Sequence, residues 1–251
     1  MKLSAIVITR NAEKKIRDCL LSLQFADEML VIDSGSTDKT ASIAKELGAK
    51  VYPVEAKGYS HSRNVGAQKS KGDWLLYLDS DERVSESLRK KISQYIANDH
   101  LPFTNYRIYR KNIILGKWLK HGGWWPDPVY RLMKKSSLIK WTGELHEQPI
   151  VNGQADCIEE PIIHLSKDSI SEMVRNSREF APIEATLMLD AEHPPVRVYH
   201  FLLAMWREFW NRGVIHMGWL DGPVGILEVF YQMFHQILVY GTLWEMQHKK
   251  E

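Results

Sequence analysis

The chain has 251 residues, enough for one large hydrophobic core or for one core with an appendage. Charged residues make up 25% and apolar residues 44%, which is ordinary for a globular protein and not for a disordered chain. The formal net charge of +2 gives no indication of a polyanion-binding surface, so no nucleic-acid partner is expected.

No signal peptide and no membrane-spanning segment are expected. The apolar run at 3–9 is too short for a signal peptide and ends at Arg10. The longest apolar stretch, 229–244, is interrupted by polar residues and falls short of a spanning helix. Cys19 and Cys157 are far apart and match no metal-site spacing, which fits a reduced compartment.

The first hundred residues alternate between predicted strands and predicted helices. Strands are expected at 3–9, 28–33, 50–54 and 73–78, with helices at 11–23, 37–47, 60–70 and 85–97. Such alternation is typical of a parallel α/β sheet, in which ligands bind beyond the carboxyl ends of the strands. Thr9, Asp33 and Asp79 all fall at those ends, so we expect them to converge on one crevice.

The pattern changes after residue 100. Short, mixed strands are expected between 101 and 165, where they would complete the sheet and cover the site. Beyond Ser166 the chain reads as helical, with a break at 192–195. The predicted fold class is α/β, with one catalytic domain at 1–165 built on a mainly parallel mixed sheet, and a helical C-terminal extension at 166–251.

The segment Asp79-Ser80-Asp81 closes the apolar strand that starts near Trp74. Two carboxylates at the end of a buried strand can hold Mg²⁺ or Mn²⁺, and substrate phosphates can complete the shell of the cation. Alone, this pattern is a weak indication, because acidic turns after strands are common. The convergence with Thr9 and Asp33 makes the metal-site interpretation much stronger.

Four motifs in this order and spacing resemble glycosyltransferase family 2; they lie at 6–11, 31–40, 62–67 and 78–82. The chain looks most like the bacterial lipopolysaccharide core β-1,4-glucosyltransferases, and that resemblance continues through 141–147 into the C-terminal helices. The resemblance implies a GT-A type nucleotide-diphospho-sugar transferase fold and transfer with inversion. It also implies a UDP-sugar donor, with glucose as the expected sugar, and the inner core of lipopolysaccharide as the acceptor.

The resemblance assigns Thr9, Asn11, Asp33 and Asp38 to the nucleotide. Asp33 is expected to accept a hydrogen bond from the base, usually uracil, since a carboxylate suits an imide N–H. An adenine amine would satisfy the same carboxylate. Asn11 also fits a helix cap, and Asp38 also fits the first turn of a helix, where an acid is favourable without any ligand.

Arg63 and Asn64 stand ahead of the fourth strand and are assigned to the nucleotide-sugar site. An arginine fork is always charged and suits a diphosphate, although Arg63 could instead hold Asp79 or Asp81 in place. Asp81 is the expected direct metal ligand. Asp79 is counted with it in the metal site and is expected to contact ribose or a metal-bound water.

The acceptor hydroxyl needs a general base, which must approach from the face opposite the diphosphate and therefore from outside the first four strands. Glu147 is the first choice, and Glu144 and Asp127 are the alternatives. His146 could orient the base or bind the metal. By resemblance, these four residues form the catalytic set.

The C-terminal helices carry apolar and aromatic residues at helical spacing, with Arg197, Arg207 and Arg212 nearby. The helices could simply pack on each other and on the catalytic domain. Alternatively, they could form a peripheral membrane patch at the cytoplasmic face of the inner membrane, where arginine meets anionic lipid. A lipid-anchored acceptor would favour the second interpretation. Assembly into a homo-oligomer is left open.

Three alternative functions were weighed. The first is a transferase of the same fold with a different donor and a lipid- or protein-linked acceptor. The second is a non-catalytic nucleotide-sugar-binding protein, against which the intact Asp33, Asp79 and Asp81 speak. The third, a dinucleotide-binding dehydrogenase, would need a Gly-x-Gly-x-x-Gly turn, and the first predicted strand is followed by 9–13, which lacks it.

Overall fold

The computed structural model describes residues 2–98, 100–143 and 147–249. The chain forms two compact units. The first comprises 1–111 and 127–164, and the second comprises 112–126 and 165–251. The second unit therefore contains the predicted helical extension and also the loop at 112–126, which the sequence analysis had included in the catalytic domain.

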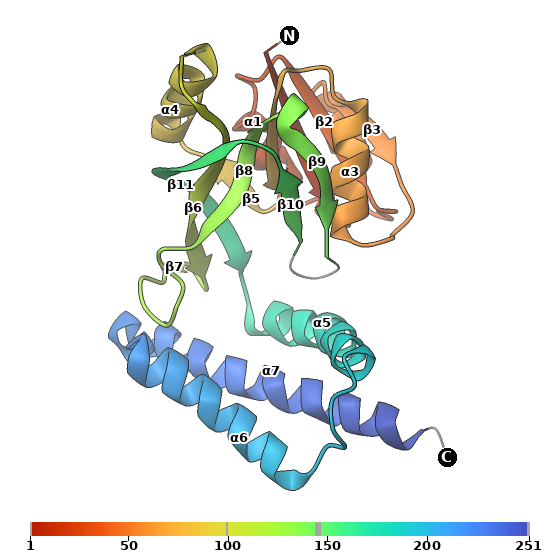
Figure 1. Ribbon diagram of the computed structural model, residues 1–251, viewed down its shortest axis with the longest axis vertical. Coiled ribbons are helices and arrows are strands. Elements are labelled where there is room, and N and C mark those ends of the chain that lie inside the picture. The colour runs from red at the N-terminus through yellow and green to blue at the C-terminus, as the bar shows by residue number, and fades with distance from the viewer. Residues whose placement is uncertain (1, 99, 144–146, 250–251) are drawn as a thin grey trace. The chain divides into compact units, whose positions relative to one another are not determined.

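Among the described residues, one sheet has nine strands in the order β3-β2-β1-β4-β8-β6-β11-β5, with β7 paired to β6 (Figure 1). The strands are β1 (Leu3–Thr9), β2 (Glu28–Asp33), β3 (Lys50–Pro53), β4 (Trp74–Asp79), β5 (Glu82–Val84), β6 (Phe103–Ile114), β7 (Lys117–Trp118), β8 (Pro128–Lys134) and β11 (Gln154–Lys167). The pairings from β3 to β4 are parallel. Beyond β4, the pairs β4–β8, β8–β6 and β11–β5 are antiparallel, so the sheet is mixed, as predicted.

Helices cover both faces of the parallel half. They are α1 (Ile16–Leu21), α2 (Thr40–Glu46), α3 (Tyr59–Lys69) and α4 (Glu86–Ala97). Strand β1 alternates between two clusters: Ala5 and Val7 pack with α1, α2 and α4, whereas Ile6 and Ile8 pack with α3. Because both faces are covered, β1 is buried along its whole length, and its sequence is almost continuously apolar.

Helices α1 and α2 begin later than predicted, at Ile16 and Thr40. The reason is local. Asn11 has a φ of 50°, which is incompatible with the start of a right-handed helix. The two loops that follow β1 and β2 are instead hydrogen-bonded to each other, as described below for the site.

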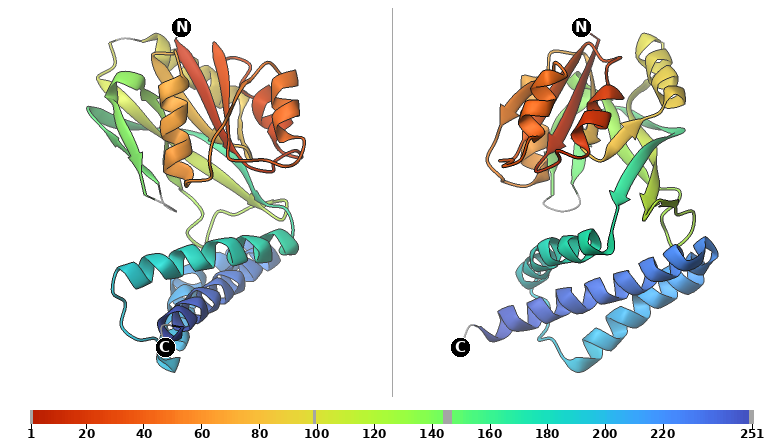
Figure 2. Two further views of the ribbon diagram at one scale, coloured as in Figure 1. Left: turned by 90° about the vertical axis from the view of Figure 1, so that its right-hand side faces the viewer. Right: turned by 180° about the vertical axis from the view of Figure 1, so that it is seen from behind.

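A second, two-stranded antiparallel sheet pairs β9 (Leu138–Thr142) with β10 (Gln148–Val151). This hairpin lies beside α3, on the same face of the large sheet (Figure 2). Trp141 of β9 is buried in the cluster formed by Ile6, Ile8 and Tyr77. The hairpin connection contains the residues predicted to supply the general base.

The second unit is built from α5 (Ile170–Asp190), α6 (Val198–Glu208) and α7 (Gly222–His248). The predicted break at 192–195 is confirmed as part of the loop between α5 and α6. Its core includes Ala204 of α6 and Leu243 of α7. Among the residues that the structure describes, no helix combines the length and the hydropathy needed to cross a membrane.

The loop at 112–126 is fastened to the helical unit by Asp221, which is buried at the start of α7. One Asp221 oxygen accepts hydrogen bonds from the amides of Lys120 and His121, both at 2.8 Å. The other lies 3.0 Å from His121 Nδ1. Gly122 adds a backbone bond to His216. These bonds explain why the loop belongs with the helices.

Candidate active site

The carboxyl ends of β1, β2 and β4 lie side by side at one edge of the sheet. Thr9, the last residue of β1, is paired with Asp33, the last residue of β2. On the other side of β1, Ile8 is paired with Asp79 at the end of β4. The predicted convergence of these three positions is therefore confirmed, at the edge where such sheets bind ligands.

Asp33 is buried, with 6% of its surface exposed. Its Oδ1 accepts hydrogen bonds from the amide of Ser36 at 3.1 Å and from the hydroxyl of Ser36 at 2.5 Å, which fixes the turn after β2. The Thr9 hydroxyl beside it is buried and has no hydrogen-bond partner. A buried hydroxyl without a partner is costly, and a polar ligand at this edge would satisfy it.

Asn11 and Asp38 tie the loops after β1 and β2 together. The Asn11 side-chain oxygen accepts a bond from the Thr37 amide at 2.8 Å. Asp38 accepts the Glu13 amide at 3.1 Å and the Thr40 amide at 2.9 Å. Burial alone would raise the pKa of Asp38, but these bonds outweigh it and lower that pKa. Both side chains thus have structural partners, but not the expected ones: α1 begins at Ile16, so Asn11 does not cap it, and α2 begins at Thr40, after Asp38.

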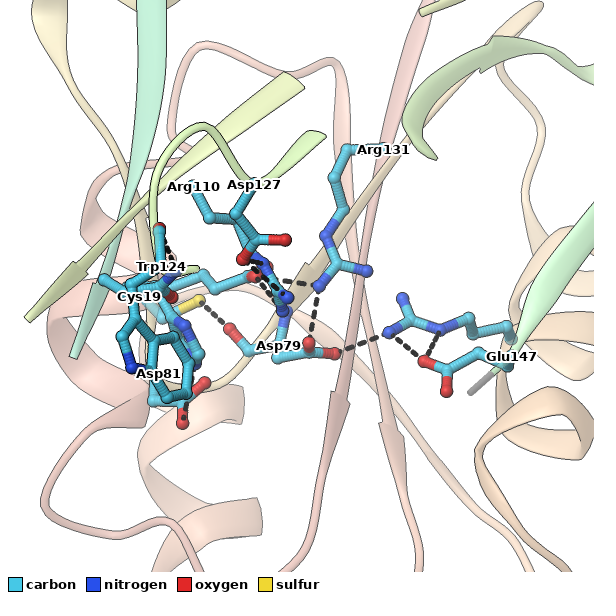
Figure 3. Close-up of polar contacts among 12 residues, drawn as sticks. Cys19, Asp79, Asp81, Arg110, Trp124, Asp127, Arg131 and Glu147 are labelled. Carbon is cyan, nitrogen blue, oxygen red and sulfur yellow. Dashed lines mark hydrogen bonds and ion pairs between the residues drawn. The ribbon is translucent and has the colours of Figure 1, made fainter. Parts of the chain in front are cut away.

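Asp79 forms ion pairs with two arginines (Figure 3). Its oxygens lie 2.8 Å from Arg63 Nη2 and 2.6 Å from Arg131 Nη2. Burial would raise the pKa of Asp79, but Arg131 and Arg63 outweigh it and hold that pKa well below its usual range. Glu82, which is fully buried, accepts the Asp79 amide at 3.0 Å and Arg131 at 2.7 Å. The acidic turn is therefore anchored from two sides.

Asp81 has a different environment. Its side chain is 27% exposed, and the nearest ion-pair partner is His164 Nε2 of β11, 3.7 Å away. Burial lowers the pKa of His164, but the Asp81 carboxylate outweighs it, and the net effect is a raised pKa. His164 is paired with Glu82 across β11 and β5. The sequence analysis missed His164, because a single histidine in a late strand carries no recognisable pattern.

Glu147 is bound by Arg63, whose side chain is 1% exposed. Glu147 Oε1 accepts Arg63 Nε at 3.0 Å and Arg63 Nη2 at 2.7 Å. The guanidinium lies 4.9 Å from the centre of the Trp141 ring, a cation–π contact. Arg63 thus bonds both Glu147 and Asp79, so the first-choice base and the acidic turn share one arginine.

Asp127 stands just before β8 and pairs with Arg110, whose Nε lies 2.8 Å from Asp127 Oδ2. Arg110 also lies 3.9 Å from Glu82. The sequence analysis missed Arg110 as well, since it is one of several basic residues along β6. Acids and arginines therefore alternate in one continuous chain of ion pairs: Asp127, Arg110, Glu82, Arg131, Asp79, Arg63 and Glu147.

The remaining predicted site residues differ in what the structure describes. The side-chain amide of Asn64 bonds the backbone of Trp141 in both directions, at 2.8 and 3.0 Å. Glu144 and His146 lie outside the described residues. The site can therefore be built from Glu147 and Asp127 among the four predicted catalytic residues.

A divalent cation fits Asp81 better than Asp79. Within the described ranges, no group of three His, Cys, Asp or Glu side chains has a metal-binding arrangement. Mg²⁺ and Mn²⁺ do not need one, since one or two carboxylates and the substrate phosphates suffice. Both Asp79 oxygens contact arginines, whereas Asp81 is partly exposed and lies 3.7 Å from His164. The donor set thus allows a cation at Asp81, with His164 within reach.

Comparison with known proteins identifies the family. The profile of glycosyl transferase family 2 matches residues 4–147, more than half of the chain. The chain belongs to glycosyl transferase family 2. The matched range contains the strand-end residues, the Asp79–Asp81 turn and Glu147. The family resemblance read from the four motifs is therefore confirmed.

Two curated proteins show how far the similarity reaches. The lipopolysaccharide core biosynthesis glycosyltransferase LpsC of Rhizobium meliloti is 21% identical over 262 aligned positions, covering 98% of this chain and 93% of LpsC. An uncharacterized glycosyltransferase of Rickettsia bellii is 39% identical over 100 residues, covering 39% of this chain. The chain spans about a third of the length of that protein and of similar Rickettsia relatives.

Among solved structures, residues 1–349 of TarS from Staphylococcus aureus in complex with UDP-GlcNAc align with this chain at a TM-score of 0.52. The alignment covers 100% of this chain and 93% of the TarS chain, at 17% identity. At that identity the likeness concerns the fold. It agrees with the GT-A type fold expected from the family 2 motifs.

Proposed function

We propose that this protein is an inverting, metal-dependent glycosyltransferase that moves a sugar from a UDP-sugar to the inner core of lipopolysaccharide. The observation that carries the proposal is the meeting of Asp33, Asp79 and Asp81 at one sheet edge, with Glu147 bonded to the arginine that holds Asp79. Such an edge can hold the nucleoside diphosphate of the donor beside a catalytic general base. The LpsC similarity supports the acceptor class.

The nucleoside is assigned to Thr9 and Asp33. Asp33 keeps one carboxylate oxygen on Ser36, and a carboxylate can accept further bonds at its other oxygen, such as one from an imide N–H. The Thr9 hydroxyl, buried without a partner, supplies a second polar atom there. UDP-glucose is the proposed donor, on the family resemblance.

Asp81 is proposed to hold the cation, with His164 beside it. When bound there, Mg²⁺ or Mn²⁺ would offset the charge that develops on the leaving diphosphate. Asp79 stays on its two arginines and positions the turn, since its carboxylate is already paired at 2.8 and 2.6 Å. Asp79 therefore acts on the metal site through the backbone of the turn.

Glu147 is proposed as the general base that takes the proton of the acceptor hydroxyl. Both of its bonds to Arg63 converge on Oε1, so Oε2 is the atom assigned to the proton. Glu147 belongs to the β9–β10 hairpin of the first unit, and so lies outside the first four strands. Asp127, paired with Arg110 at 2.8 Å, is the competing candidate.

The function is tested by a panel of nucleotide sugars with the purified protein. We expect UDP-sugars to raise the melting temperature in the presence of Mn²⁺ and UDP-glucose to be turned over with release of UDP. If only adenine or guanine nucleotide sugars raised the melting temperature of the protein, the uridine assignment would be overturned. Binding of UDP-sugars without any turnover would indicate the non-catalytic alternative.

The base is tested by two matched substitutions. Glu147→Gln is expected to lower the turnover of UDP-glucose by about 1000-fold, because proton transfer by a positioned base is worth about 10²–10⁴. Asp127→Asn should lower it by less than about tenfold. Initial-rate kinetics with saturating donor measure both. The reverse order of effects would transfer the role to Asp127.

We also propose that the protein acts at the cytoplasmic face of the inner membrane as a peripheral protein. On α6 and the π-helix that continues it (Phe209–Ile215), four residues at successive i+4 positions are exposed by 47–77%: Val198, Leu202, Trp206 and Trp210. Between 196 and 244 the three acidic side chains are at most 15% exposed, while Arg207 is 63% exposed. Apolar groups with exposed arginine and shielded acids suit an anionic lipid surface.

A further inference from the structure

The β9–β10 hairpin needs support from outside its own two strands. Among the residues that the structure describes, its two strands form a sheet of their own, separate from the large one. A two-stranded hairpin is at best marginally stable in water by itself. Glu147 directly precedes β10 and must lie at the site if it is the general base. An element of the first unit therefore has to hold the hairpin in a defined place.

Helix α3 provides that support through three polar residues on one face. Ser60, Arg63 and Asn64 are spaced i, i+3 and i+4, which puts them side by side on a helix. Ser60 Oγ donates to the carbonyl of Gly143 at 2.6 Å. Arg63 bonds Glu147. The two residues that bracket the hairpin connection are therefore both bonded to α3.

Asn64 acts on β9 in the way that a neighbouring strand would. Its Nδ2 donates to the Trp141 carbonyl at 3.0 Å, and its Oδ1 accepts the Trp141 amide at 2.8 Å. A carboxamide has one donor end and one acceptor end, like a peptide group, so it completes a strand edge. The Trp141 ring then packs edge-on against Tyr77 at 5.0 Å, which fixes the register of β9 over the sheet.

Arg63 connects the β9–β10 hairpin to the acidic turn at the end of β4, where the nucleotide sugar is proposed to bind. One nitrogen, Nη2, lies 2.7 Å from Glu147 Oε1 and 2.8 Å from Asp79 Oδ1. Arg63 is almost fully buried and both of these bonds are charge-assisted, so its position is strongly constrained. A diphosphate would have to displace Asp79 or Glu147 to bond Nη2, whereas the other terminal nitrogen, Nη1, is buried without a hydrogen-bond partner.

We propose that Ser60, Arg63 and Asn64 form a positioning platform for the general base, and that Arg63 Nη2 and the side-chain amide of Asn64 serve this platform rather than the nucleotide. The platform holds the β9–β10 hairpin so that Glu147 stands at a fixed distance from the acidic turn. This inference rests on the proposed function, and it reassigns two residues that the sequence motif had placed at the nucleotide.

The test separates donor binding from turnover in the full-length protein. UDP binding with Mn²⁺ is measured by calorimetry, and UDP release from UDP-glucose, with water as the acceptor, gives kcat and KM. For Arg63→Lys we expect kcat to fall by about 100-fold, since a displacement of about 1 Å can cost that much. The UDP affinity and the KM for UDP-glucose should stay within about threefold.

Asn64→Asp keeps the shape of the side chain but loses the donor to Trp141. We expect it to lower kcat by about tenfold or more and to speed amide hydrogen exchange across 138–151, again without loss of UDP affinity. Gln68→Ala, on an exposed position one turn further along α3, is the matched control and should behave like the parent. If Arg63→Lys does not fold, Asn64→Asp still carries the test.

A double substitution tests whether the effect of Arg63 on kcat depends on Glu147. In a Glu147→Gln background, Arg63→Lys should cause little further loss, because residues that act as a unit are not additive. Weakening of UDP binding by Arg63→Lys or Asn64→Asp to the same extent as kcat would overturn the platform. A parent protein that neither binds nor releases UDP would overturn the proposed function and this inference with it.

Discussion

At the scale of single residues, the site is organised by buried charges that pair with opposite charges. Glu82 is fully buried and Arg131 is 4% exposed, which is tolerable only because they bond each other. The carboxylates raise the pKa of Arg131, although burial opposes them. Their common task is to hold Asp79, so that the turn that follows it has one conformation. Asp81, which contacts no arginine in these ion pairs, is thereby left for the proposed cation.

Asp81→Ala is predicted to remove the metal dependence. We expect the turnover of UDP-glucose to fall by at least about 100-fold, because a Lewis-acidic cation supplies several kcal/mol of transition-state stabilisation. Titration of activity against Mn²⁺ measures the effect. Asp73→Ala, an exposed acid at the opposite end of β4, is the control. A parent-like Mn²⁺ titration for Asp81→Ala would refute the assignment.

Glu28, far from the site, should govern part of the pH dependence of stability. It accepts Ser4 Oγ at 2.7 Å and the Lys71 amide, and it pairs with Lys50 at 3.1 Å. Burial would raise the pKa of Glu28, but these partners outweigh it and lower that pKa. A depressed folded-state pKa means stability that is present above the unfolded pKa and lost as the pH falls through the folded one.

Glu28→Gln is therefore predicted to cost about 2 kcal/mol at pH 7, the usual scale for a buried hydrogen-bonded charge. The difference from the parent should begin to shrink as the pH falls below the unfolded-state pKa of about 4.3, because the unfolded chain then binds the proton before the folded one does. Urea unfolding at a series of pH values measures it. A difference that stays constant from pH 7 to pH 3 would contradict the charge argument.

At the scale of elements, α3 sits close to the sheet because of Gly66. A Cβ at that position would collide with Cγ2 of Ile6, and it would come within 3.4 Å of Ile32. Both isoleucines are completely buried, so they have little room to move. The glycine of the third motif thus sets the distance between α3 and β1, and with it the place of Arg63.

Gly66→Ala is predicted to destabilise the protein by about 1–3 kcal/mol, the usual cost of overpacking. In an exposed helix the same change would stabilise by about 1 kcal/mol, so the sign of the effect reports the close approach. Thermal unfolding gives that sign. Gln68→Ala on the same helix is a control without the collision, and equal effects of the two changes would contradict the packing argument.

The elements show where sequence patterns suffice and where they do not. Strands β1, β2 and β4 were predicted closely, because a strand buried on both faces must be continuously apolar. The starts of α1 and α2 were not, since Asn11 and Asp38 bond across two loops that are 25 or more residues apart. Strand β5 was missed because three residues, Glu82 to Val84, are too few for any period to appear.

At the scale of the whole molecule, the chain divides into a catalytic unit and a helical unit. Within the helical unit, Lys167 and Glu228 form a buried ion pair at 2.7 Å. Burial lowers the pKa of Lys167, although Glu228 opposes the shift. Between 196 and 244 the acids Glu208, Asp221 and Glu228 are shielded, while apolar groups and Arg207 are exposed. This distribution is the basis for the proposed membrane surface.

The membrane proposal predicts flotation with lipid. The parent protein should float with vesicles that contain phosphatidylglycerol and not with pure phosphatidylcholine. Leu202→Ser combined with Trp206→Ser, both on the exposed stripe of α6, should reduce bound protein by about tenfold. Leu21→Ser, an exposed apolar residue of α1, is the control.

Two outcomes would oppose this membrane proposal. Equal flotation of the parent and of the double variant would show that the α6 stripe does not contact lipid. A parent that stays with the soluble fraction, but changes from dimer to monomer on the double substitution, would make the stripe an interface between two copies of the chain.

The amino-acid sequence by itself determined the family, the α/β alternation and the edge at which Thr9, Asp33 and Asp79 meet, because period and strand ends are local properties. The bonding partners of Arg63 and Asn64 were decided by tertiary structure. Their partners, Glu147 and Trp141, lie 84 and 77 residues away. A motif records which residue stands at a position, whereas its bonding partners depend on which distant segments the fold brings beside it.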